Sequence, residues 1–161
     1  TSDNSVGFLP RFSRGFFLNI SLTMLFSYLM AQSKTITKAP AGSKVAVLGA
    51  SPKPDRFSFH TVHRLKEHGY KPIPVHPAGH SVDGVSGTKS LDDIKEPIDT
   101  LTMYVNAKIS DELTGKILRL KPRRVIFNPG AENEELAMKL EAAGIEVVRH
   151  CTLVMLDLGI Y

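Results

Sequence analysis

The stretch "KVAVLGASPKPDRFSFHTVHRLKEHGY" (Lys44–Tyr70) decides the fold of this chain. It begins with a continuous apolar run, Val45–Leu48, of the kind found in strands that are buried on both faces. Gly49 ends the run, and a loop with two prolines and two basic side chains follows. A helical pattern then begins near Ser58. A strand, a glycine turn and a helix in this order predict the first β–α unit of a parallel sheet.

Short apolar runs and helical patterns alternate along the rest of the chain. Further strands are expected at residues 72–76, 101–105, 124–127 and 145–148. Helices are expected at 59–67, 109–120 and 134–143, with a helical turn at 91–94 and a short closing helix at 153–158. Because the strands are short and apolar throughout, helices should cover both faces of the sheet. The sequence therefore predicts an α/β fold with an open, mainly parallel sheet of about five strands.

Composition and charge favour one globular domain. The chain has 161 residues, of which 42% are hydrophobic and 22% are charged, as is ordinary for a single domain. The net charge is +4, but residues 1–43 hold four basic residues against one acidic residue, and residues 44–161 hold 16 against 15. The expected domain, residues 44–161, is therefore almost neutral. It lacks the basic tract that neutralises many phosphates, so we expect no nucleic-acid partner.

The first 43 residues are interpreted as an extension outside the fold. Residues 15–31 are apolar and follow Arg11 and Arg14, which resembles a secretory signal or a marginal membrane span. The sequence opens with Thr1, and Met30 begins an ordinary short polar leader, so an upstream extension is the favoured interpretation. Residues 32–43 are expected to form a flexible connector. A membrane partner is expected only if residues 15–31 are a genuine membrane segment.

The chain contains one cysteine, Cys151, so an intramolecular disulfide is excluded. This fits a reducing compartment, and a cytoplasmic location is expected. Cys151 is the one candidate nucleophile in the sequence, although a small buried apolar role is the more ordinary interpretation. No H-E-x-x-H, C-x-x-C or paired-carboxylate signature appears. Metal binding and hydrolysis therefore lack support.

The loop after the first strand has the composition of a diphosphate site. In open α/β sheets, ligands bind outside the carboxyl ends of the strands. Gly49 lets the backbone approach a ligand closely, Ser51 offers a hydroxyl, and Lys53 and Arg56 add positive charge. Ser58 is predicted to cap the following helix, whose free N–H groups attract anions. A plain tight turn with solvated charges is the alternative.

The glycine pattern excludes two common nucleotide motifs, because it is neither G-x-x-x-x-G-K-[ST] nor G-x-G-x-x-G. An NAD site would place an acidic residue at the end of the second strand, where this chain has His76 and Pro77. A histidine and a proline suit packing against an adenosine, although His76 could equally cap the strand end without a ligand. The later strand ends bring six more residues to the same rim: Tyr104, Val105, Asn106, Asn128, Pro129 and Gly130.

Five segments together resemble the small stand-alone CoA-binding proteins: "VAVLGASPKPDRFS", "HGYKPIPVHP", "SLDDIKEPIDTLTMYVN", "NPGAENEELAMKLEAAGIEVV" and the cysteine in "RHCTLVM". The resemblance covers residues 44–157 and implies a Rossmann-like fold, similar to the CoA-binding domain of the succinyl-CoA synthetase alpha subunit. It implies coenzyme A or acyl-CoA as ligand, with the diphosphate at Gly49–Ser51 and the helix that follows. It implies adenosine near His76 and Pro77, although the family often has Asn before that proline. It also implies that the pantetheine arm passes Val105 and Pro129–Gly130.

Synthetases of this type need a phosphorylatable histidine and an ATP-grasp partner, for which a chain ending at Tyr161 has no room. We therefore expect a non-catalytic CoA or acyl-CoA binding module, with a homo-oligomer left open. The alternatives are an NAD(P)-type nucleotide binder or small oxidoreductase, and a membrane-tethered adaptor that rests only on the N-terminal segment. The expected contact residues are Gly49, Ala50, Ser51, Lys53, Arg56, Ser58, His76, Pro77, Val105, Asn106, Pro129 and Gly130.

Overall fold

The computed structural model describes residues 36–161. The apolar segment 15–31 and Met30 lie outside the described residues. Strands and helices alternate in the order β1 (Lys44–Leu48), α2 (Phe57–Glu67), β2 (Lys71–Val75), the 3₁₀ turn η1 (Leu91–Asp93), β3 (Thr100–Met103), α3 (Ala107–Leu120), β4 (Arg124–Phe127), α4 (Glu134–Ala142), β5 (Glu146–Arg149) and α5 (Thr152–Asp157). In the described part of the chain, no helix has the length and apolar character to cross a bilayer.

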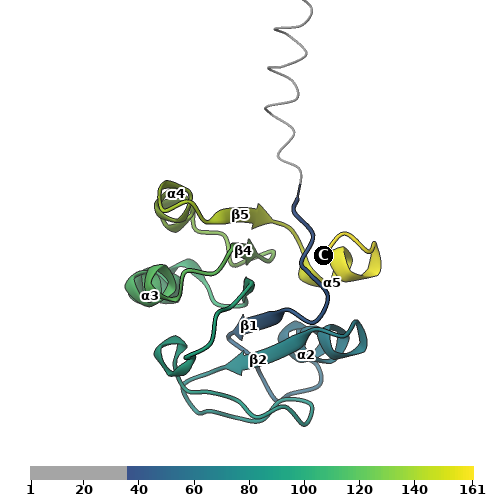
Figure 1. The fold of residues 1–161 in the computed structure, drawn as a ribbon. Coiled ribbons are helices and arrows are strands. Elements are labelled where there is room, and N and C mark those ends of the chain that lie inside the picture. Colours follow the sequence, from purple (N-terminus) through teal and green to yellow (C-terminus); the bar gives the residue numbers. More distant parts are fainter. Residues whose placement is uncertain (1–35) are drawn as a thin grey trace, which may run out of the picture. The chain divides into compact units, whose positions relative to one another are not determined.

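The five strands form one parallel sheet in the order β2-β1-β3-β4-β5. Helices α3 and α4 cover one face of the sheet, and α2 and α5 cover the other (Figure 1). The predicted α/β fold with a parallel sheet is therefore confirmed. The chain runs outward from β1 to β2 and then returns past β1 to β3, so the strand order reverses between β1 and β3. In open α/β sheets the crevice at such a reversal is where ligands bind.

Two apolar layers hold the helices to the sheet. Alternate residues of each strand point to opposite faces, so each strand contributes to both layers. On one face Leu101, Met103 and Phe127 are at most 2% exposed and belong to the same core as Leu136 of α4. On the other face the strand residues pack with buried residues of α2 and α5, among them Leu65. Burial of this kind contributes roughly 1.5–3 kcal/mol for each large side chain, and it fixes the carboxyl ends of the strands in one plane.

A short segment before β1, residues 36–39, is bound to the amino-terminal end of the sheet. Ala39 is 5% exposed, and its N–H donates to the carbonyl of Tyr161 at 3.0 Å. The fully buried guanidinium of Arg124 donates from Nη1 to the carbonyl of Thr37 at 2.9 Å and from Nε to Oγ1 of Thr100 at 2.7 Å. The same guanidinium lies 4.5 Å from the centre of the Tyr161 ring. The compact unit therefore begins at Ile36, before the boundary expected at residue 44.

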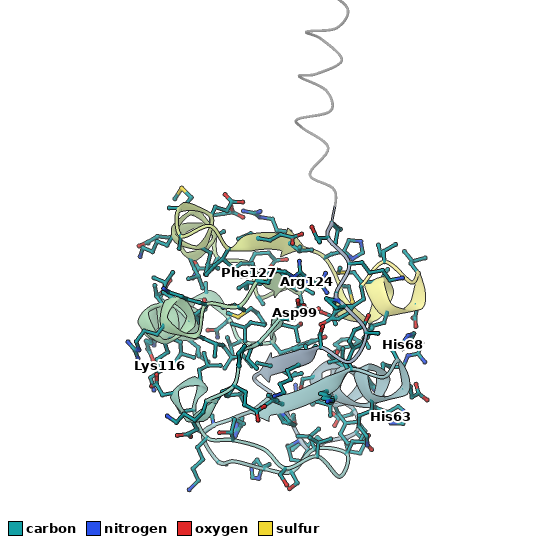
Figure 2. The ribbon with its side chains drawn as sticks, viewed as in Figure 1. His63, His68, Asp99, Lys116, Arg124 and Phe127 are labelled. Carbon is teal, nitrogen blue, oxygen red and sulfur yellow. The ribbon has the colours of Figure 1, made fainter. Side chains whose placement is uncertain are left out.

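An ion-pair network lies beside this segment. Arg123 pairs with Asp99 at 2.7 Å and with Glu146 at 2.9 Å, and Glu146 also accepts the N–H of Thr37. Figure 2 shows Asp99 near Arg124, whose N–H donates to the carbonyl of Asp99 at 3.1 Å. Burial opposes ionisation of Asp99, but hydrogen bonds from Arg123 and Thr100 outweigh it and hold the pKa of Asp99 below its ordinary value.

Asp99→Asn is expected to lower the melting temperature at pH 7, and the deficit should shrink as the pH falls below about 4, the ordinary pKa of an aspartate. The pKa of Asp99 is lower in the folded state, so its stabilising effect is present above the unfolded pKa and is lost as pH falls through the folded pKa. Circular dichroism melts at pH 7 and pH 3 measure the two deficits. Asp55→Asn is the control, because Asp55 is exposed and forms no ion pair with residues 36–161. A deficit equal at both pH values would contradict this account.

Candidate functional site

The turn after β1 is closed by backbone contacts that only glycine allows. Gly49 has φ = 85°, and its N–H donates to the carbonyl of Val75 at 2.9 Å. A Cβ at this position would lie 2.8 Å from the carbonyl oxygen of Tyr104 and 2.9 Å from Cγ1 of Val105. Both the backbone angle and the lack of space therefore exclude a side chain. The turn brings the end of β1 against the ends of β2 and β3.

The start of α2 differs from the prediction. The helix begins at Phe57 with Arg56 as its N-cap residue, and no side chain caps it. The prediction that Ser58 is the N-cap was therefore wrong, because Ser58 lies inside the first turn. Its buried hydroxyl instead accepts the N–H of Ser51 at 3.1 Å and ties the loop to the helix. Because no side chain caps it, the helix start keeps backbone N–H groups available for an anion.

A cavity of about 330 Å³ lies over this loop and the start of α2. It is lined by Gly49, Ala50, Ser51, Lys53, Arg56, Phe57, Ser58, His76 and Tyr104. Lys53 and Arg56 are exposed, and neither forms an ion pair with any residue of the described domain. Two unpaired cations and an uncapped helix start give the cavity a positive potential. Seven of the expected contact residues meet here.

A second cavity, of about 410 Å³, continues from Gly49 toward β2 and α3. Its lining includes His76, Pro77, Val105 and Asn106, all four of which were expected at the rim. His76 accepts the N–H of Ala78 on Nδ1 at 3.1 Å, so it stabilises the strand end while it lines both cavities. The side-chain oxygen of Asn106 accepts the N–H of Ile109 at 3.1 Å and caps α3.

A third, smaller cavity of about 170 Å³ lies at the ends of β3, β4 and β5. It is lined by Phe57, Tyr104, Asn128, Pro129 and Cys151. Pro129 was expected at the rim, but Gly130 lines none of these three cavities. The N–H of Gly130 donates to Oε2 of Glu132 at 2.8 Å, because the chain turns there into the loop before α4.

Two aromatic residues of the site were not among the expected contact residues, although Tyr104 was expected at the rim. Tyr104 lines all three cavities, and its hydroxyl bonds to Oγ1 of Thr61. Burial raises the pKa of Tyr104 to about 12, so the side chain is a neutral phenol at pH 7. Phe57 is 73% exposed between the first and third cavities. The available signal was position alone: one aromatic follows a strand and the other begins the helix.

The histidines at α2 do not line the cavity over the loop. Of residues 36–161, no group of three or more His, Cys, Asp or Glu side chains could hold a metal. His60, His63 and His68 are exposed, and Figure 2 shows His63 and His68 at α2. A further cavity of about 450 Å³ is lined by Lys38, Tyr70 and Tyr161 among others. It includes His68, the C-cap of α2, where the helix dipole is negative, so it suits a phosphate poorly.

Comparison with known proteins identifies relatives of the whole domain. Residues 43–157 match the model of a protein family described as CoA binding domain. The uncharacterized protein YneT of Bacillus subtilis is 29% identical over 105 residues, which cover 65% of this chain and 78% of that protein.

Solved structures agree with the fold. One crystal structure of an uncharacterized protein is 42% identical and covers 76% of this chain and 100% of that chain, with a TM-score of 0.67. A structure from Thermus thermophilus is 28% identical and covers 86% of this chain and 98% of that chain, with a TM-score of 0.69.

Proposed function

This chain belongs to the family of CoA binding domains, and on that premise we propose that it binds coenzyme A or an acyl-CoA without turning it over. The observation that carries the proposal is the 330 Å³ cavity over the Gly49–Ser58 loop. Its position outside the carboxyl ends of β1 and β3, its uncapped helix and its unpaired Lys53 and Arg56 suit a diphosphate.

The adjoining cavities suit the two ends of such a ligand. The cavity beside β2 offers His76 and Pro77 for an adenosine, and the ring of His76 already stacks on that of His80 at 5.3 Å. Aromatic and imidazole rings favour flat stacked partners. In the other direction, Tyr104 and Pro129 border an apolar path toward β4 and β5, as a pantetheine arm requires. The ligand would therefore cross the sheet edge from β2 toward β5.

Recognition of an NAD ribose is disfavoured by the same geometry. Such sites place a carboxylate at the end of the second strand, and β2 ends beside His76. The carboxylate in the loop that follows, Asp83, is bound by Lys66 at 2.7 Å and by His63 at 3.2 Å. These two bonds lower the pKa of Asp83 and keep its carboxylate paired with side chains of α2.

Calorimetric titration with CoA, acetyl-CoA, NAD and NADP tests the proposal. CoA is expected to bind at least about tenfold more tightly than NAD, a difference of about 1.4 kcal/mol, because β2 ends without the carboxylate that would bond the adenosine ribose diol of NAD. Acetyl-CoA should bind comparably to CoA and should be recovered unhydrolysed afterwards. Native mass spectrometry of the purified protein checks which ligand it already carries. Equal or tighter binding of NAD would overturn the proposal in favour of a dinucleotide site.

A further inference from the structure

Cys151 occupies a place in the small cavity that the proposed binding function leaves unused. The thiol is free and half-buried, in the loop between β5 and α5. The cavity shares Phe57 and Tyr104 with the cavity over the phosphate-binding loop, so the two are neighbours with a common wall. A ligand that starts at the loop can therefore extend into the space beside the sulfur.

The distance across the sheet matches the length of a pantetheine arm. The loop follows β1 and Cys151 follows β5, and the order β1-β3-β4-β5 puts three strand spacings between them. At about 4.8 Å for each spacing, the span is about 14 Å. Between its phosphate and its sulfur, a pantetheine arm has roughly as many chain bonds as the backbone of a four-residue peptide. Four residues reach about 13–14 Å when extended. A CoA whose diphosphate lies at the loop would thus carry its sulfur to the end of β5.

We propose that Cys151 captures the sulfur of bound CoA as a mixed disulfide, a step that rests on the proposed function. The co-reactant is a low-molecular-weight disulfide that contains CoA. The Cys151 thiol loses its proton, its sulfur attacks the CoA sulfur, and the new bond forms as the old disulfide bond breaks. The other half leaves as a thiolate and takes up a proton, so no external oxidant is required.

The surroundings favour disulfide exchange over acyl transfer to the same thiol. Acyl transfer needs hydrogen-bond donors for an oxyanion, and the side-chain amide nearest the cavity belongs to Asn128. Its Nδ2 donates to Oγ1 of Thr102 at 2.7 Å and to the carbonyl of Met103 at 3.0 Å, so both of its protons are committed. Disulfide exchange requires only that the sulfurs meet in line. An apolar cavity beside a half-buried sulfur provides that approach.

The test incubates the full chain with CoA disulfide or, separately, with glutathione disulfide and follows intact mass. CoA disulfide is expected to add one CoA less two hydrogens, reversibly with dithiothreitol. At micromolar reagent, CoA disulfide should react with Cys151 on the order of a hundred times faster than glutathione disulfide. The reason is that binding holds CoA disulfide beside the thiol at an effective concentration in the millimolar range. Cys151→Ser should form no adduct with either disulfide. Cys151→Ser combined with Val154→Cys moves the thiol to an exposed position on α5 and should react with both disulfides equally slowly.

The outcomes separate the two proposals. Equal rates for the two disulfides in a chain that binds CoA would overturn the capture by Cys151 and leave the binding function standing. Equal preference for CoA disulfide by the Val154→Cys variant would also overturn it, since position would then be irrelevant. Failure of both the unchanged chain and Cys151→Ser to bind CoA would overturn the binding function and the capture together.

Discussion

Gly49→Val is expected to abolish CoA binding and to lower the free energy of unfolding by at least about 3 kcal/mol. The φ of 85° costs a non-glycine residue about 1–2 kcal/mol. The new side chain also meets the carbonyl of Tyr104 at 2.8 Å, a contact that only a shift of β1 or β3 can relieve. That shift would disturb the ends of both strands, where the loop must hold the phosphates. Urea unfolding and calorimetry with CoA measure the two effects.

The structure makes Gly49 necessary for the turn itself, so a second variant must separate the site from the fold. Lys53→Ala should leave the melting temperature unchanged and weaken CoA binding by only about 0–1 kcal/mol, as for an exposed ion pair. The loss should shrink further at high salt. Lys71→Ala removes an exposed lysine at the amino end of β2 and should have no effect on binding. If folded Gly49→Val binds CoA with unchanged affinity, the loop is only a turn.

Deleting residues 1–43 is expected to destabilise the domain by about 3 kcal/mol more than deleting residues 1–35. The longer deletion removes the Thr37 carbonyl and leaves a buried donor of Arg124 without a partner, at a cost of about 1–3 kcal/mol. It also removes the burial of Ile36 and Ala39, which adds about 1–2 kcal/mol. The shorter deletion keeps all of these contacts. Urea unfolding of the two shortened chains measures the difference.

A matched variant assigns the effect to the guanidinium. In the chain lacking residues 1–43, Arg124→Met should recover part of the lost stability, because it removes a buried guanidinium that has lost its hydrogen bond to Thr37. In the chain lacking only residues 1–35, the same substitution should destabilise. A chain that starts at Met30 keeps residues 36–39 and should fold and bind CoA like the full chain. Equal stability of the two deletions would show that residues 36–39 do not contribute.

The layout of the sheet could be predicted from the sequence because it follows from local patterns. Runs such as Val45–Leu48 and Val125–Phe127 are apolar at every position, a pattern typical of strands that are covered on both faces. Helix patterns between them force parallel crossovers, and the glycine turn after β1 then falls beside the reversal in strand order. On this basis six residues of the loop and helix start, and His76 at the end of β2, were expected at one rim of the sheet, and all seven line one cavity.

The missed features depend on contacts between distant parts of the chain. Ser58 reads locally as a cap, but its hydroxyl is taken by Ser51 once the loop folds back. Residues 36–39 read as a linker because the partner that binds them, Arg124, lies 87 positions from Thr37. Tyr104 lines all three cavities, and no residue spacing in the sequence predicts that the three cavities adjoin at this side chain. Gly130 was expected at the rim, but its N–H is taken by Glu132.

The most direct test of the central claim is a map of backbone amide shifts in ¹H–¹⁵N spectra on addition of CoA. If the loop after β1 holds the diphosphate, the largest shifts should fall on Ser51 and on Phe57 and Ser58 at the start of α2. Smaller shifts should follow at His76 and Tyr104. With 3′,5′-ADP in place of CoA, the shift at Ser51 should persist only if a phosphate of 3′,5′-ADP reaches the loop. Largest shifts around Tyr70 and Tyr161, which line the 450 Å³ cavity, would contradict the account.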